Sequence, residues 1–159
     1  MPEDSPSNEA LVKKLYEGLK NLDSHQMNSC YHSQATFEDP VFGKLDAKET
    51  KAMWQMLCSR AKDFSLEIDK IECDSEKGKG SLVAKYTFSP TGRRVENHIE
   101  SEFTFKNGKI LEQRDRFSLW KWTRQAVGVS GWLFGWLPNF RSKLQQKVKR
   151  GLHQFMDSR

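Results

Sequence analysis

Residues 95–105 are VENHIESEFTF, a segment in which apolar and polar side chains alternate. The odd positions include Val95, Ile99 and Phe103, whereas the even positions carry acids, a histidine and a threonine. Because successive side chains of a strand point to opposite faces, we predict a long strand whose odd positions are inside. Similar alternation on either side predicts an antiparallel sheet that extends over residues 64–119.

The turn at Asn107-Gly108 determines which face of the following strand is inside. A two-residue turn would pair Phe105 with Ile110 and would put Asp115 on the outer face. A three-residue loop would instead align Ile99 with Asp115 and put this acid inside. The odd positions of the following strand are the more apolar ones, so we predict the three-residue loop.

Several polar side chains then share the inner face of the sheet with aromatic ones. A dry core would require a buried partner for each polar group. We therefore predict a wet pocket inside a curved sheet. The polar residues expected to line it are Asn97, Ser101, Gln113 and Asp115, and the aromatic ones are Tyr31, Phe37, Tyr86 and Phe103.

The segment Ala35-Thr36-Phe37-Glu38-Asp39-Pro40 places an acid on the apolar side of a short strand. Ala35, Phe37 and Asp39 share one face, so partial desolvation is expected to raise the pKa of Asp39 toward neutrality. A general base that works at neutral pH needs such a pKa. The alternative is a structural acid that caps a loop or faces water before Pro40.

The chain is long enough for one domain with a single core, and we expect an α+β fold. Leucines spaced along residues 11–22 predict a first helix, with Tyr16 beside their stripe. A short second helix is expected to carry Tyr31, and Asp46-Ala47-Lys48-Glu49 predicts a capping box that opens a third. We expect residues 1–7 to be a disordered leader, residues 8–128 the domain, and residues 129–159 an extension.

The net charge of +5 is distributed unevenly. From Leu119 onward the chain has eight Lys or Arg and one acid, Asp157, so this part carries +7 and the preceding part −2. The basic surface is therefore expected on the C-terminal segment, and we do not expect the domain to bind nucleic acid.

The three cysteines are odd in number and do not have the spacing of metal ligands. We expect reduced thiols in a cytoplasmic protein, with no metal and no cofactor. The first residues lack the basic and apolar regions of a signal peptide, and no apolar run is long enough to cross a bilayer.

Helices, a strand carrying Glu38-Asp39-Pro40, and a long meander containing Asn107-Gly108-Lys109-Ile110 resemble the nuclear transport factor 2-like superfamily. Within it, the chain resembles the ketosteroid isomerase and SnoaL-like polyketide cyclase branch over most of residues 8–120. The resemblance implies a conical barrel in which N-terminal helices close a strongly bent antiparallel sheet around a deep pocket. It also implies a homodimer.

The resemblance places Asp39 at the position of the isomerase base, which moves a proton between carbons of an enolisable ketone. Tyr16 falls within one residue of the tyrosine that hydrogen-bonds the enolate oxygen, and Tyr31 falls on its supporting neighbour. The second oxyanion donor of the isomerases is a protonated Asp, and Ser101 stands in its place. The isomerase site is therefore incomplete.

The segment Arg114-Asp115-Arg116-Phe117 is also similar to limonene epoxide hydrolases, where it contributes one acid of an Asp-Arg-Asp triad. The other two members would form Arg-x-Asp on a neighbouring strand, but residues 85–87 are Lys-Tyr-Thr. Of that triad arrangement, this chain has only the pair Asp39 and Asp115 in one expected pocket. Two such acids can differ in pKa, so that one acts as a base and the other as an acid.

Two classes of function remain open. The first is a pocket that binds a small hydrophobic or carbonyl-bearing molecule, with or without isomerase-, cyclase- or hydrolase-type catalysis by Asp39. Asp115 would be the second acid and Tyr16 the oxygen-stabilising donor. The second class is a non-catalytic module that contacts a protein or a membrane surface through residues 129–159.

The extension contains GWLFGWLP at residues 131–138, and Asn139 is expected to cap a final helix. The apolar stripe of this helix extends from Phe140 to Phe155, with basic residues on the other side. One interpretation is docking on the domain, with the tryptophans covering the pocket mouth or the sheet. Another is binding to an anionic membrane surface. Nucleic acid is disfavoured, because the tryptophans are not interleaved with the basic residues.

Overall fold

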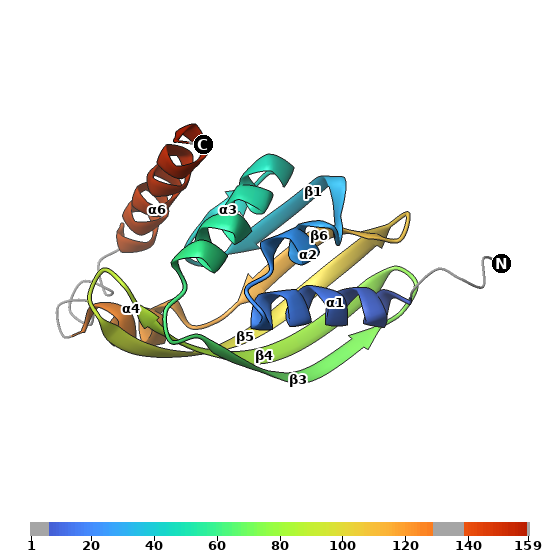
Figure 1. The fold of residues 1–159 in the computed structure, drawn as a ribbon, viewed down its shortest axis with the longest axis horizontal. Coiled ribbons are helices and arrows are strands. Elements are labelled where there is room, and N and C mark those ends of the chain that lie inside the picture. Colours follow the sequence, from blue (N-terminus) through green and yellow to red (C-terminus); the bar gives the residue numbers. More distant parts are fainter. Residues whose placement is uncertain (1–6, 129–138, 159) are drawn as a thin grey trace.

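The computed structural model describes residues 7–128 and 139–158. The elements in chain order are α1 (Asn8–Lys20), α2 (Ser24–Asn28), β1 (Tyr31–Asp39), β2 (Gly43–Leu45), α3 (Ala47–Arg60), β3 (Ser65–Cys73), β4 (Lys77–Phe88), β5 (Arg93–Lys106), β6 (Lys109–Arg116), α4 (Leu119–Val127) and α6 (Phe140–Asp157). The strands form one curved, open sheet in the order β2-β1-β6-β5-β4-β3. Helices α1, α2 and α3 cover one face of it, and α6 lies beside α3 (Figure 1). The predicted α+β architecture is thus confirmed.

The sheet is mixed rather than wholly antiparallel, because β1 and β6 run parallel. Both strands therefore end on the same side of the molecule, β1 at Asp39 and β6 at Arg116. Phe37 pairs with Gln113, so the same register two residues further on brings Asp39 beside Asp115.

The turn between β5 and β6 is shorter than predicted. Asn107 and Gly108 form a two-residue turn, both with positive φ, and Phe105 pairs with Ile110. Positive φ at both positions is characteristic of the turn that matches the twist of a hairpin. The predicted three-residue loop and the predicted alignment of Ile99 with Asp115 are therefore wrong.

A bulge nevertheless places Asp115 inside, as predicted. The register shifts after the turn, so that Thr104 lies opposite Glu112 and Leu111 is left as the extra residue. Beyond the shift Ser101 lies opposite Asp115, and both side chains are buried. One additional residue in a strand exchanges its two faces. The bulge, and not the turn, therefore turns this acid inward.

Strand β4 begins at Lys77 and contains two glycines, Gly78 and Gly80. A Cβ added at Gly80 would lie 2.9 Å from carbons of the Tyr16 ring and closer still to its hydroxyl oxygen. A Cβ added at Gly78 would lie 2.5 Å from the Cys73 sulfur. These glycines leave room for neighbouring side chains inside a strand.

The ends of helices α1, α2 and α3 agree with the sequence signals except at two residues. Ser7, which we assigned to the leader, accepts a hydrogen bond from the Ala10 amide and caps α1. Tyr31 is the first residue of β1 and not part of the second helix. The predicted capping box of α3 is present, since Asp46 and Glu49 each accept a hydrogen bond from the other's backbone amide.

Helix α6 docks on the domain through its apolar stripe. Leu152 is 0% exposed, and Leu144, Val148 and Phe155 pack against the same core. Asn139 occupies the N-cap position, but its side chain makes no capping hydrogen bond, contrary to the prediction. The tryptophans predicted to cover the pocket or the sheet lie outside the described residues. Among those that are described, no helix is both long and apolar enough to cross a lipid bilayer.

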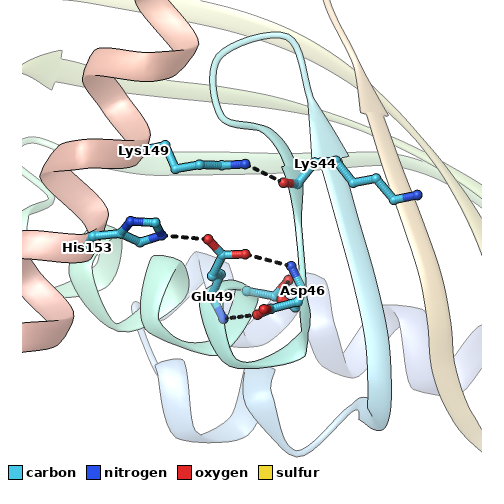
Figure 2. Close-up of polar contacts among 6 residues, drawn as sticks. Lys44, Asp46, Glu49, Lys149 and His153 are labelled. Atoms are coloured by element: carbon cyan, nitrogen blue, oxygen red, sulfur yellow. Dashed lines mark hydrogen bonds and ion pairs between the residues drawn. The ribbon is translucent and has the colours of Figure 1, made fainter.

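Polar contacts fasten the same helix to the β1–β2 turn, to β2 and to the start of α3, and Figure 2 shows two of them. We call this set the α6 seam. It comprises Gln145 Nε2 to the Pro40 carbonyl oxygen at 3.1 Å, Lys149 Nζ to the Lys44 carbonyl oxygen at 2.8 Å, and His153 Nε2 to Glu49 Oε2 at 2.7 Å. The seam orients α6 so that its N-terminal turn lies near the ends of β1 and β6.

Candidate functional site

Asp115 lies on the inner face of β6 and is 8% exposed. Its Oδ1 accepts hydrogen bonds from Ser101 Oγ at 2.7 Å and from Gln113 Nε2 at 3.0 Å. Burial raises the pKa of Asp115 to about 6, while the two hydrogen bonds oppose the rise because they favour the charged form. Its Oδ2 forms no hydrogen bond within the described residues, so this oxygen remains available to a ligand.

A buried chain of donors leads to Asp115. Trp54 Nε1 donates to the Tyr31 hydroxyl at 2.9 Å, and this hydroxyl donates to Gln113 Oε1. Gln113 then donates to Asp115. We call Trp54, Tyr31, Gln113, Ser101 and Asp115 the Asp115 network. Each donor in this series of hydrogen bonds points toward the carboxylate. The series therefore fixes the amide orientation of Gln113, and its hydrogen bonds polarise one another in one direction.

Asp39 performs the structural role that we kept as an alternative. Its Oδ1 accepts hydrogen bonds from the amides of Val41 at 2.9 Å and Phe42 at 2.6 Å. Burial nevertheless raises the pKa of Asp39 to about 7. The neighbouring Asp115 raises it further, whereas the two amides and Arg141 lower it. Oδ2 of Asp39 has no hydrogen-bond partner in the described part of the chain, so capping and proton transfer are compatible.

The two acids line one pocket of about 360 Å³, beyond the C-terminal ends of the parallel strands β1 and β6. We call it the aspartate pocket. The described residues that line it are Glu38, Asp39, Pro40, Arg114, Asp115, Arg116, Phe117 and Arg141. Sequence reasoning missed its arginines, although two of them flank Asp115 in the sequence and were available as a signal.

The other predicted site residues do not line this pocket. Tyr31, Ser101 and Gln113 belong to the Asp115 network. Phe37 and Phe103 are buried on the strands that flank Gln113, each directly opposite it. These five side chains hold or surround the acid, and their predicted contact with a ligand stays a prediction.

Tyr16 lies on α1 behind the network and is almost fully buried. Its ring is 6.2 Å from that of Phe103, and its hydroxyl occupies the space that Gly80 leaves open. The hydroxyl forms no hydrogen bond of standard geometry among the described residues. Burial raises the pKa of Tyr16 above its ordinary range, and the neighbouring Ser101 partly opposes this. The predicted donor role of Tyr16 stays untested.

Burial raises the pKa of Tyr86, and the negative charge of the nearby Asp39 raises it further. Tyr86 accepts a hydrogen bond from Trp122 Nε1 on α4 at 2.8 Å. Asn97 is buried opposite Ala84 and makes no side-chain hydrogen bond within the described ranges. Sequence reasoning missed Trp54 and Trp122 as partners of the tyrosines. The signal was chemical, because a buried indole requires an acceptor.

The open, bent sheet covered by helices is the fold of solved structures described as ketosteroid isomerase-like and NTF2-like. The sequence model of the SnoaL-like domain matches residues 12–113. The chain therefore belongs to the SnoaL-like domain family.

Solved structures of similar fold come from several bacteria. An LEH-like epoxide hydrolase of M. tuberculosis has a TM-score of 0.64 and 18% identity, covering 81% of this chain and 98% of its own. IdmH from Streptomyces antibioticus, a candidate polyketide cyclase, has a TM-score of 0.64 and 18% identity, covering 78% and 100%. A Catenulispora acidiphila protein with a ketosteroid isomerase-like fold, in complex with trimethylamine, has a TM-score of 0.66 and 11% identity, covering 87% and 99%. At such identities the similarity concerns the fold. No curated protein sequence matches the chain.

Proposed function

We propose that the chain binds a small carbonyl- or epoxide-bearing organic molecule in the aspartate pocket and that Asp39 acts on it as a general base. One observation carries this proposal: Asp39 and Asp115 share a pocket, and burial raises the pKa of each. One oxygen of each carboxyl is held by the protein, which orients the other. Perturbed acids that share a cavity are typical of acid–base sites.

The two carboxyls have different roles in this proposal. Asp39 is the stronger base, and its pKa of about 7 matches neutral working conditions. On a ketone it takes a proton from the carbon beside the carbonyl, and the electrons of the broken C–H bond form an enolate. The proton then returns to the same or another carbon. On an epoxide, Asp39 instead takes a proton from water, whose oxygen bonds to a ring carbon while the bond from that carbon to the epoxide oxygen breaks. The proton then passes to the released alkoxide, and the product is a diol. Ionised Asp115 increases the basicity of Asp39 and stabilises its protonated form.

A carbon-detected NMR titration of the Asp carboxyls tests the electrostatic part of the proposal. We expect Asp39 to titrate above pH 6, well above the ordinary Asp value of about 3.9. In the Asp115→Asn variant the pKa of Asp39 falls, because a neighbouring negative charge is removed. If both acids titrate near pH 4 in the wild-type protein, Asp39 is a loop-capping acid only and the proposal fails.

Proton abstraction is tested directly by deuterium exchange into enolisable ketones in D₂O, followed by proton NMR. We expect the wild-type protein to accelerate exchange in a panel that includes 4-oxo-4-phenylbutanamide. Asp39→Asn lowers the rate by about 10²–10⁴-fold, the usual contribution of a general base. Asp157→Asn is the matched control on the exposed end of α6, and its rate is unchanged. Absence of acceleration with the whole panel contradicts catalysis on ketones.

The alternative function, a free C-terminal interaction module, receives less support because the apolar stripe of α6 packs against the domain. The family resemblance supports one further part of the proposal. We propose a homodimer, which sedimentation velocity would distinguish from a monomer. We also propose a cytoplasmic location, in keeping with three free cysteines.

A further inference from the structure

We propose that the substrate of the aspartate pocket carries a carboxylate, and that Arg141 of α6 binds this group while the reacting carbon lies near Asp39. The inference rests on the proposed function and adds to it a substrate class and a specificity residue. Arg141 lies outside residues 12–113, the part of the chain that matches the family model. The end of β6 and the C-terminal helix would therefore complete a site that the matched domain begins with Glu38, Asp39 and Pro40.

Arg141 differs from the other two arginines of the pocket in its ionic partners. Arg114 Nη2 lies 3.5 Å from Glu38 Oε2, and Arg116 Nη2 lies 3.3 Å from Glu102 Oε2. Arg141 forms no ion pair or hydrogen bond within the described residues. The positive charge of Arg141 nevertheless acts on the pocket, because it lowers the pKa of Asp39. A guanidinium group with unused donors matches the geometry of a carboxylate.

Helix stability does not explain a cation at this position. Arg141 is the second residue of α6, where a positive charge opposes the helix dipole and slightly destabilises the helix. The apolar stripe and the α6 seam hold the helix in the orientation that delivers this turn to the pocket. At the N-terminal end of α6, docking of the helix therefore adds Arg141 to the lining of the pocket.

The charge balance of the pocket favours an anion below neutral pH. Three arginines line it, against the carboxyls of Glu38, Asp39 and Asp115. Because burial raises the pKa of both aspartates, protonation leaves the lining with a net positive charge at pH 6. Such a pocket attracts anions, and this attraction weakens as Asp39 ionises. We therefore expect carboxylate affinity to fall between pH 6 and pH 8.

The experiment compares two ligands that differ in charge and little else, 4-oxo-4-phenylbutanoate and its amide. Dissociation constants are measured at pH 6 by calorimetry for the wild-type protein, Arg141→Gln and Arg150→Gln. We expect the acid to bind the wild-type protein about 10–100-fold more tightly than the amide, the range of a charge-assisted hydrogen-bonded pair. Arg141→Gln abolishes this preference. Arg150→Gln, an exposed cation of the same helix that does not line the pocket, retains it.

The outcomes separate this inference from the proposed function. Equal affinity for acid and amide in the wild-type protein overturns the carboxylate assignment, while the proposed function survives if the amide still exchanges its protons. A preference that persists in Arg141→Gln overturns the role of Arg141. If neither compound binds, the inference is rejected, and the exchange panel alone then decides the proposed function. Circular dichroism confirms that Arg141→Gln retains α6.

Discussion

The Asp115 network and the α6 seam are both sets of polar contacts, but their side chains are buried to different extents. The network is enclosed between the sheet and α3, and all five of its residues are buried. In the seam, the side chain of His153 is 53% exposed and that of Glu49 16%. A buried donor that loses its acceptor cannot turn to water, whereas an exposed one can. The network is therefore expected to determine the position of the Asp115 carboxylate, and the seam only to orient a helix that Leu152 holds.

The largest effect is expected from Gln113→Leu, which breaks the network at its centre. The Tyr31 hydroxyl loses its acceptor and Asp115 loses a donor. At about 1–3 kcal/mol for each buried group left without its bond, the free energy of unfolding should fall by about 2–6 kcal/mol. Urea denaturation measures this change.

Gln154→Leu is the matched control, an exposed glutamine of α6, and should change the stability by less than about 0.5 kcal/mol. The pKa of Asp115 should also rise in Gln113→Leu, because a hydrogen bond to its charged form is lost. Equal stability losses in the two variants would contradict the stabilising role of the network.

Leu152→Ala tests whether apolar packing, rather than the seam, holds α6. Leu152 is the fully buried residue of this helix, and truncation of a buried leucine costs about 2–5 kcal/mol. We expect α6 to detach before the domain unfolds, so trypsin should cleave faster after Lys147 and Arg150. Leu57→Ala on α3, where the leucine is exposed, should leave the cleavage rate unchanged. Slow cleavage in Leu152→Ala would show that the seam suffices.

Two glycines should respond in opposite directions to the same substitution. Gly80→Ala forces a Cβ against Tyr16 and should lower stability by about 1–3 kcal/mol, the usual cost of overpacking. Combining it with Tyr16→Phe should restore part of the loss, since the hydroxyl is the nearest atom. Gly151→Ala on α6 meets no atom within 4 Å and should raise stability by about 0.5–1 kcal/mol. Thermal melts measure both.

The smallest effect is expected from His153→Gln in the seam. Burial acts to raise the pKa of Glu49, but hydrogen bonds from His153 and the Asp46 amide lower it overall. An acid with a lowered folded-state pKa stabilises the protein above its unfolded pKa, and this contribution is lost as the pH falls. His153→Gln should therefore cost less than about 1 kcal/mol at pH 6 and almost nothing at pH 3. A loss that grew on acidification would contradict this sign.

Local patterns in the sequence determined much of the domain. The alternation over residues 95–105 predicted the inner face of β5, and the apolar side of Ala35 and Phe37 predicted the partial burial of Asp39. The capping box of α3 and the stripe of α6 were also correct. Such features depend on backbone geometry within a few residues, so composition and spacing report them directly.

Only the tertiary structure decided how these parts meet. The bulge at Leu111 turns Asp115 inward, and the parallel pairing of β1 with β6 places Asp39 beside it. The pairing of Trp54 with Tyr31 and the approach of Arg141 to the pocket join segments distant in the sequence. Strand register and helix docking depend on packing across the whole core, and a shift of one residue would exchange the faces of a strand. The spacing of residues within one segment therefore does not predict the strand register or the docking of the helix.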